Sequence, residues 1–153
     1  MAPVRQPPPI SSVLFACTYN MIRSPMAAGL LRHFHGQRLF VDSVGVRDGE
    51  EVDPFAVAVM EEMGIDLSRH ACKTFEELED TSFDLIISLS PEAHHRAIEM
   101  TRTMACDVEF WNTFDPTLVD GNREAMLEAY RKVRDGLLDR IKERFPLTRG
   151  PTV

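Results

Sequence analysis

Five residues separate Cys17 from Arg23, and Arg23 is followed directly by Ser24-Pro25. The apolar residues 12–16 lead into the cysteine and predict a buried strand, while Ser24-Pro25 predicts a helix start with serine at the N-cap. A loop between the carboxyl end of a strand and a helix N-terminus can direct its backbone N–H groups toward a tetrahedral oxyanion. The spacing therefore predicts a phosphate-binding loop with a thiol at its first residue and a guanidinium at its end.

Each residue type in this loop suits one part of phosphoester chemistry. The Arg23 guanidinium can hold two phosphate oxygens at once, and a positive environment favours the nucleophilic thiolate of Cys17. Asn20 tolerates left-handed backbone angles and can brace the loop, and Ser24 can donate a hydrogen bond to the sulfur. The predicted phosphate-binding residues are Thr18, Tyr19, Asn20, Met21, Ile22, Arg23 and Ser24. The alternative, a structural cysteine beside an unrelated arginine, does not explain why a strand precedes the loop and a Ser-Pro helix start follows it.

A thiolate nucleophile needs a nearby acid to protonate the leaving oxygen. Asp115-Pro116 follows the predicted strand 107–111, and loops after parallel strands gather at one sheet edge, where ligands bind. Asp115 is therefore the predicted acid. A second Asp-Pro pair, Asp53-Pro54, is interpreted as a turn and helix start.

The composition limits the other functions available to the chain. Of its 153 residues 44% are hydrophobic and 27% charged, which is typical of a globular protein, and its net charge of −7 argues against general binding to nucleic acid or to anionic membranes. No apolar run approaches the roughly 18 residues of a membrane span. The three cysteines are widely spaced and odd in number, unlike a secreted disulfide framework, so a cytoplasmic location is predicted. Neither a cofactor nor a metal is predicted, since the five histidines lack ligand spacing.

Strands and helices alternate along the chain, which predicts an α/β fold with a parallel sheet. Residues 1–11 are predicted to be a proline-rich N-terminal arm, 12–146 a single phosphatase domain, and 147–153 a C-terminal tail. The last helix is predicted over 123–145, with an apolar stripe that includes Met126 and Tyr130 and with Arg131 and Lys132 facing water. The predicted strands are 12–16, 38–43, 83–89 and 107–111, and the other predicted helices begin near residues 24, 54 and 91.

Taken together, the Cys17–Arg23 loop, residues 42–46, residues 63–70, the strand 83–89 and Asp115-Pro116 resemble the low-molecular-weight protein tyrosine phosphatases. The resemblance implies a three-layer α/β/α fold of the phosphotyrosine protein phosphatase I-like type, with a four-stranded parallel sheet in the order 2-1-3-4. It implies Cys17 as nucleophile, Arg23 as phosphate clamp and Asp115 as acid and then base. The implied partners are a phosphorylated protein or a small phosphoester, with inorganic phosphate, sulfate or vanadate as site ligands.

The chain departs from this family at three places. Tyr19 stands where the family usually has glycine, and Ile22 stands where a second, guarding cysteine is common. The aromatic residues that flank the pocket in eukaryotic-type members are replaced by residues 46–51 and by Thr117-Leu118. A phosphotyrosine ring would find fewer aromatic residues to stack on. Only a weak preference for phosphotyrosine peptides over small phosphoesters is therefore expected.

Two other functions are compatible with the same loop. Arsenate reduction, performed by some proteins of this fold, uses a loop cysteine and two more cysteines after the third strand. Residues 88–93 contain none, and Cys72 and Cys106 lie elsewhere, so reduction would need an external thiol. A non-catalytic phosphate sensor is the other alternative, although pure binding does not require the Cys17 thiolate.

Overall fold

The computed structural model describes residues 9–79 and 82–146, and its centre is a parallel sheet. The four strands are β1 (Ser12–Cys17), β2 (Phe40–Gly45), β3 (Leu85–Ser88) and β4 (Asp107–Phe110). They pair in the order β2-β1-β3-β4, and every pairing is parallel. The predicted fold class and strand order are confirmed.

Strands β1 and β3 are buried along their whole length, as expected for central strands covered on both faces. Because all strands run the same way, their carboxyl ends meet at one edge. Cys17 pairs with Gly45 at that edge, and Ser88 pairs with Phe110. The loops that follow these four residues therefore surround one region of the surface.

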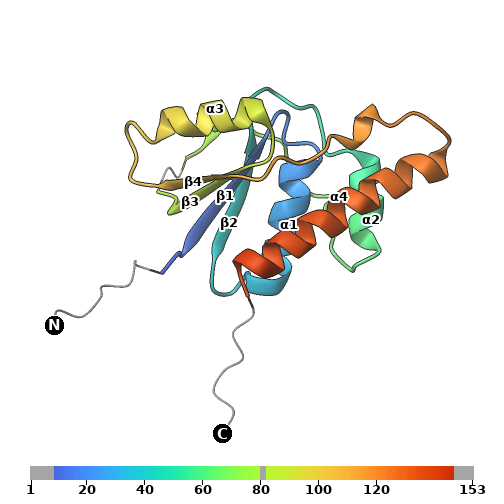
Figure 1. Cartoon of the computed structure of the whole chain (residues 1–153), viewed down its shortest axis with the longest axis horizontal. Helices are drawn as coiled ribbons and strands as arrows, with labels where there is room; N and C mark the ends of the chain where they lie inside the picture. Colours follow the sequence, from blue (N-terminus) through green and yellow to red (C-terminus); the bar gives the residue numbers. More distant parts are fainter. Residues whose placement is uncertain (1–8, 80–81, 147–153) are drawn as a thin grey trace, which may run out of the picture.

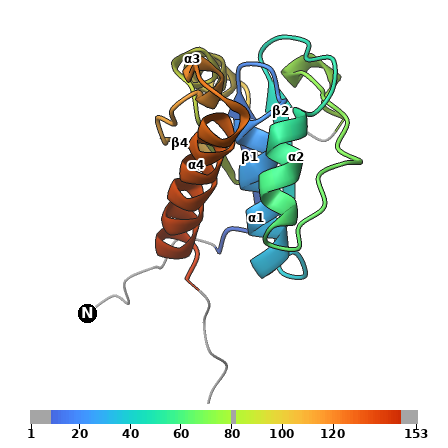
Figure 2. The same ribbon diagram turned by 90° about the vertical axis from the view of Figure 1, so that its right-hand side faces the viewer.

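The helices form a layer on each side of the sheet, as Figures 1 and 2 show. One core cluster joins Val13 and Phe15 of β1 to α1 (Arg23–His35), α2 (Pro54–Glu61) and α4 (Arg123–Arg144). The other joins Leu14 and Ala16 to α3 (Pro91–Met100). Alternate residues of one strand thus serve opposite layers, which is the period-two geometry of a β-strand.

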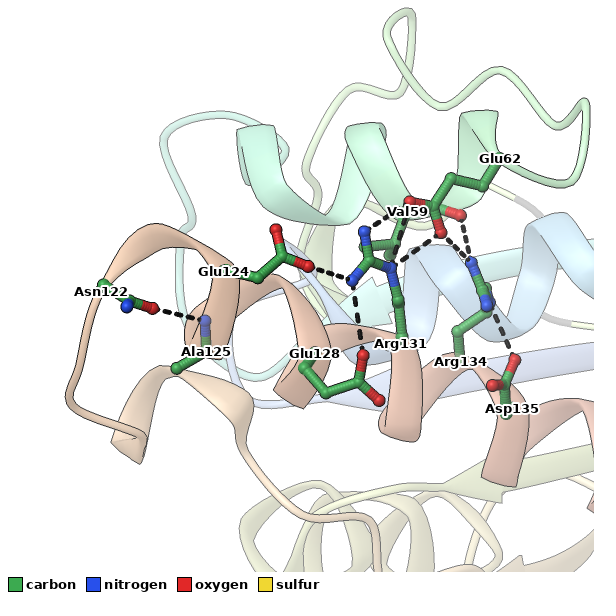
Figure 3. A network of polar contacts seen from close by, with 9 residues as sticks. All are labelled: Val59, Glu62, Asn122, Glu124, Ala125, Glu128, Arg131, Arg134 and Asp135. Atoms are coloured by element: carbon green, nitrogen blue, oxygen red, sulfur yellow. Dashed lines mark hydrogen bonds and ion pairs between the residues drawn. The ribbon is translucent and has the colours of Figure 1, made fainter.

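An ion-pair cluster fastens α4 to the end of α2 (Figure 3). The Glu62 carboxylate accepts hydrogen bonds from Arg131 Nε at 3.1 Å and from Arg134 Nη1 at 2.7 Å. These contacts hold the pKa of Glu62 at about 2, far below its usual value near 4.5. Arg131 was expected to face water, but its side chain is only 25% exposed and is held by carboxylates.

Several predicted boundaries are wrong by one or two residues. Strand β2 begins at Phe40 rather than residue 38, because the N–H groups of Arg38 and Leu39 donate to His35 O in a turn after α1. Strand β3 covers only 85–88 of the predicted 83–89. In α4 the core position is taken by Leu127, whereas Met126 is only half-buried.

Two short 3-10 helices, η1 (Phe75–Glu77) and η2 (Pro116–Leu118), were not predicted. The predicted arm 1–11 and tail 147–153 fall mostly or wholly outside the described residues. Of the arm, the structure describes Ser11, whose backbone N–H donates to Asp84 Oδ2 at 2.8 Å. Within residues 9–79 and 82–146, no helix is both long enough and apolar enough to cross a membrane.

Candidate active site

The loop from Cys17 to Arg23 joins β1 to α1 and folds around the Cys17 sulfur. Cys17 is buried, and its Sγ accepts a hydrogen bond from Asn20 N at 3.3 Å. The Ser24 hydroxyl lies 2.9 Å from the same sulfur. Donors of this kind stabilise a thiolate, both before attack and when it departs as a leaving group.

Asn20 fixes the course of the loop with nearly every polar atom that it has. Its φ is 60°, the left-handed region that asparagine tolerates better than most residues. Its side-chain nitrogen donates to Ser24 Oγ and Ser43 Oγ, each at 2.9 Å, and its Oδ1 accepts from Lys73 N at 3.0 Å. An apolar residue at this position would leave these buried partners unsatisfied.

Two residues from the segment before β3 hold the backbone of the loop. His70 Nε2 lies 3.0 Å from Asn20 O, and Cys72 Sγ donates to the same carbonyl at 3.1 Å. Since a carbonyl only accepts, His70 carries its proton on Nε2. Burial lowers the pKa of His70, so the ring is neutral at pH 7 and acts as a hydrogen-bond donor to the loop.

Ser24 was predicted both to cap α1 and to donate a hydrogen bond to the Cys17 sulfur, and only its position near the sulfur agrees with the structure. It was expected to cap α1, but the helix begins at Arg23 after Ile22, with no side-chain cap. The Ser24 hydroxyl is instead turned toward Cys17 and lies 3.3 Å from Val44 O. The predicted start of the helix is therefore correct to within one residue, and the predicted serine cap is wrong. The corresponding cap on α3 is confirmed, since Ser90 Oγ accepts from Ala93 N.

Two glycines allow neighbouring segments to approach the loop closely. A Cβ on Gly45 would lie 2.7 Å from the Tyr19 carbonyl carbon, and one on Gly49 would lie 2.3 Å from Tyr19 O. Both distances are shorter than a van der Waals contact allows, and in both cases the nearest atom belongs to the backbone. Side chains at residues 45 and 49 would push the loop out of place.

A cavity of about 170 Å³ opens above the sulfur. Its walls include Cys17, Arg23 and Asp115, the three predicted catalytic residues, which come from segments up to 98 positions apart. The remaining wall residues are Tyr19, Met21, Ile22, Asp53 and Thr117. The structure thus brings the nucleophile, clamp and acid candidates to one cavity.

Of the predicted phosphate-binding residues, Tyr19, Met21, Ile22 and Arg23 line this cavity with Cys17. Thr18, Asn20 and Ser24 do not: Thr18 Oγ1 donates to Ser90 Oγ at 3.1 Å, and the other two are fully buried braces. Arg23 Nη1 donates to Thr113 O at 3.0 Å, which ties the clamp to the segment that carries Asp115.

Asp115 is the N-cap of η2. Its Oδ1 accepts from Thr117 N at 3.0 Å and from Thr117 Oγ1 at 2.7 Å. Within the described residues its Oδ2 has no hydrogen-bond partner. One oxygen therefore holds the loop and the other is available for proton transfer.

Asp53 is a cavity residue that the sequence did not reveal. It caps α2 through Phe55 N, as expected for Asp-Pro at a helix start, and its other oxygen accepts from Tyr130 OH at 3.1 Å. Burial, with the Asp53 charge as a second cause, raises the pKa of Tyr130, which keeps that phenol protonated as a donor. Only the packing of α4 on α2 could have shown that this cap faces the cavity.

The remaining cysteines lie apart from the cavity. Burial raises the pKa of both Cys72 and Cys106, and neither residue is a wall residue. All three cysteines are free thiols. In the part of the chain that the structure describes, no three His, Cys, Asp or Glu side chains are grouped as a metal site would require.

Comparison with known proteins gives consistent matches over this whole region. Residues 12–144 match the family described as low molecular weight phosphotyrosine protein phosphatase. An arsenate reductase of Bacillus subtilis is 30% identical over 131 residues, covering 86% of this chain and 92% of its own length. A low molecular weight protein-tyrosine-phosphatase of Streptomyces coelicolor is 31% identical over 135 residues, covering 81% and 80%. The crystal structure of such a phosphatase from T. tengcongensis superposes with a TM-score of 0.71 at 27% identity, covering 88% of this chain and 99% of that one.

Proposed function

This chain belongs to the low molecular weight phosphotyrosine protein phosphatase family, and from that premise we propose that it hydrolyses phosphate monoesters through a phosphocysteine intermediate. Its relatives include both phosphatases and arsenate reductases. Hydrolysis of a phosphoester needs a nucleophile, an anion clamp and an acid. It does not need a second cysteine at the site.

In the first step the Cys17 thiolate attacks phosphorus, and the bond from phosphorus to the ester oxygen breaks. Asp115 gives its proton to that oxygen, so the leaving group departs as an alcohol or phenol. Arg23 and the loop N–H groups hold the phosphoryl oxygens. In the second step water attacks phosphorus, Asp115 takes a proton from the water, and the sulfur leaves as a thiolate beside Ser24.

The observation that supports this proposal most directly is the set of groups around the Cys17 sulfur. Asn20 N and Ser24 Oγ both lie within hydrogen-bonding distance of it, and the cavity above it is walled by Arg23 and Asp115. A purely structural cysteine would not require hydrogen-bonding groups at its sulfur, and a phosphate sensor would not require an acid beside its binding loop.

The test is turnover of p-nitrophenyl phosphate by the parent and by Cys17→Ser. The serine variant should lose nearly all turnover but still bind phosphate, because a serine hydroxyl is hardly ionised at neutral pH. Iodoacetate should label Cys17 before Cys72 and Cys106, whose thiols are held in the protonated form by burial, and phosphate should protect it. Residual turnover above a few percent in Cys17→Ser would contradict the mechanism.

Arsenate reduction is the second candidate, because the Bacillus subtilis relative carries that name. Cys72 donates to Asn20 O and Cys106 packs in the α3 layer, so neither is placed as a cavity thiol. Reduction by this chain would therefore depend on an external thiol. The assay measures arsenite formed from arsenate with glutathione and glutaredoxin, or with thioredoxin, against phosphatase turnover of the same preparation.

The cavity walls offer a phosphotyrosine ring few aromatic contacts, so we expect only a weak preference for phosphotyrosine peptides over small phosphoesters. Tyr19, 49% exposed, is the aromatic residue among the wall residues, and Met21, two residues further along the loop, lines the same cavity. Thr117 takes the place after Asp115-Pro116 where an aromatic ring would stack. We expect a low affinity for phosphotyrosine peptides, with Tyr19 as the main ring contact.

A further inference from the structure

A second and larger cavity, of about 530 Å³, lies beside the active site. Its walls are formed by one face of α4 and by the segment that joins β4 to α4. Its volume falls within the range of small-molecule sites. We call it the α4 groove; its lining residues are Asn112, Thr113, Phe114, Val119, Ala125, Glu128, Ala129, Lys132, Val133, Gly136, Leu137 and Arg140.

The floor and walls of the α4 groove are largely apolar. Val133 and Leu137 are buried core residues, and Phe114 leaves 57% of its surface exposed. Gly136 opens the middle of the helix face, since a Cβ there would meet no atom within 4 Å. An exposed phenyl ring and an open helix position that line the same groove can receive an apolar body.

The polar groups of the groove carry an excess of positive charge. Lys132 and Arg140, two turns apart on α4, make no ion pair within the described residues. The one carboxylate among the lining residues, Glu128, lies 3.4 Å from Arg131 Nη1 and pairs with it (Figure 3). Lys132 and Arg140 are the two cations among the lining residues of the groove. The nearby Arg131 and Arg134 are not lining residues, and both form ion pairs with Glu62.

The groove shares one wall segment with the active site. Thr113 and Phe114 line the groove, and the next residue, Asp115, lines the catalytic cavity. Thr113 O also accepts the hydrogen bond from Arg23 Nη1. A molecule that binds in the groove and contacts Phe114 therefore touches the residue between Thr113, which accepts the hydrogen bond from Arg23, and Asp115, the proposed acid.

We propose that the α4 groove binds a small amphipathic anion, an apolar body with one acidic group, and that its occupancy is coupled to the catalytic cavity through residues 113–115. The apolar body lies over Val133, Leu137 and the gap at Gly136. The acidic group pairs with Lys132 or Arg140. This site differs in chemistry from the catalytic cavity, which takes the phosphoryl group itself.

Binding is tested with anilinonaphthalene sulfonate, an aromatic probe with one sulfonate, by fluorescence titration of the full chain. Excess vanadate is present to fill the catalytic loop. The parent should bind one probe molecule saturably, and Gly136→Leu, which fills the gap, should weaken binding at least about tenfold. Lys132→Met and Arg140→Met should each weaken it about two- to fivefold, the range of exposed ion pairs.

Lys142→Met is the matched control, because Lys142 lies on the same helix outside the α4 groove and makes no ion pair with any residue that the structure describes. It should change the affinity less than twofold, a difference too small for a specific ion pair. Far-UV circular dichroism checks that each variant is folded. If Gly136→Leu does not fold, the lysine and arginine variants decide the question by themselves.

Failure of the parent to bind the probe saturably in the presence of vanadate, or unchanged binding in Gly136→Leu, would overturn the proposed site. A dimer that dissociates in Gly136→Leu would also overturn it, since the occupant would then be a second copy of this chain. Sedimentation velocity distinguishes that case.

Coupling is read from p-nitrophenyl phosphate turnover, which rests on the proposed function, and from phosphate affinity, which does not. Saturating probe should change one of them at least about fivefold in the parent and neither in Gly136→Leu. No change in either quantity refutes the coupling. If turnover is absent altogether, the proposed function fails while the binding result stands.

Discussion

Replacing Asp115 by asparagine separates its two roles, because the two carboxylate oxygens have different partners. Oδ1 accepts both hydrogen bonds from Thr117, at 3.0 and 2.7 Å, and an asparagine Oδ1 can accept them in the same way. Oδ2 has no partner in the described part of the chain and would carry the transferred proton. Asp115→Asn should therefore keep the loop in place and remove only the acid.

The expected loss depends on the leaving group. General acid catalysis contributes roughly 10²–10⁴-fold, so kcat/KM for phenyl phosphate should fall by about that factor in Asp115→Asn. For p-nitrophenyl phosphate, whose phenolate leaves without help, the loss in kcat/KM should stay below about tenfold. The comparison uses kcat/KM because breakdown of the phosphocysteine, in which Asp115 also acts, does not enter that ratio.

Thr117→Val is the matched control for loop position. It removes the hydroxyl bond to Asp115 Oδ1 and leaves the backbone bond, so it should lower kcat/KM by about two- to tenfold, and equally for both esters. If Asp115→Asn also lowered kcat/KM by the same factor for both esters, Asp115 would serve only to hold the loop in place. The acid would then have to be another group, and Asp53 is the other carboxylate among the cavity wall residues.

Three further predictions concern other parts of the molecule. Ser24→Ala removes the hydroxyl 2.9 Å from Cys17 Sγ and should slow phosphocysteine hydrolysis about ten- to a hundredfold, measured as a larger burst of p-nitrophenol before a slower steady state; an unchanged steady-state rate would contradict this role. Glu62→Gln should lower the free energy of unfolding by urea by about 1 kcal/mol at pH 7, a value reduced for solvent screening because the carboxylate is 40% exposed. Folding lowers the pKa of Glu62 from near 4.5 to about 2, so its stabilising effect is full above pH 4.5 and is lost as the pH falls toward 2. The unfolding free energies of parent and variant should therefore converge near pH 2. A difference that stays constant with pH would be inconsistent with the ion pairs as its source. Thr117→Tyr should raise kcat/KM for a phosphotyrosine peptide relative to p-nitrophenyl phosphate by about two- to tenfold through ring stacking, and a parent that already favours the peptide several hundredfold would show that Tyr19 or another wall suffices.

Local sequence signals were enough to predict the parallel sheet and the candidate catalytic loop. Apolar runs of strand length alternate with helix starts such as Asp53-Pro54 and Ser90-Pro91, and these local signals depend only on neighbouring residues. The Cys17–Arg23 spacing is local as well, because five residues must turn within one loop whatever surrounds them. Family resemblance added the strand order, which periodicity does not contain.

Tertiary structure alone decided which distant groups meet at the loop. His70, Cys72 and Lys73 hold Asn20 across about fifty residues of sequence, and nothing in their own neighbourhood predicts it. Ser24 illustrates the same limit in part, since its sequence context predicted both a helix cap and a contact with the Cys17 sulfur, and only the folded structure shows that the contact forms and the cap does not. A hydrogen bond depends on positions in space, and those positions are set by the packing of the whole sheet and its helices.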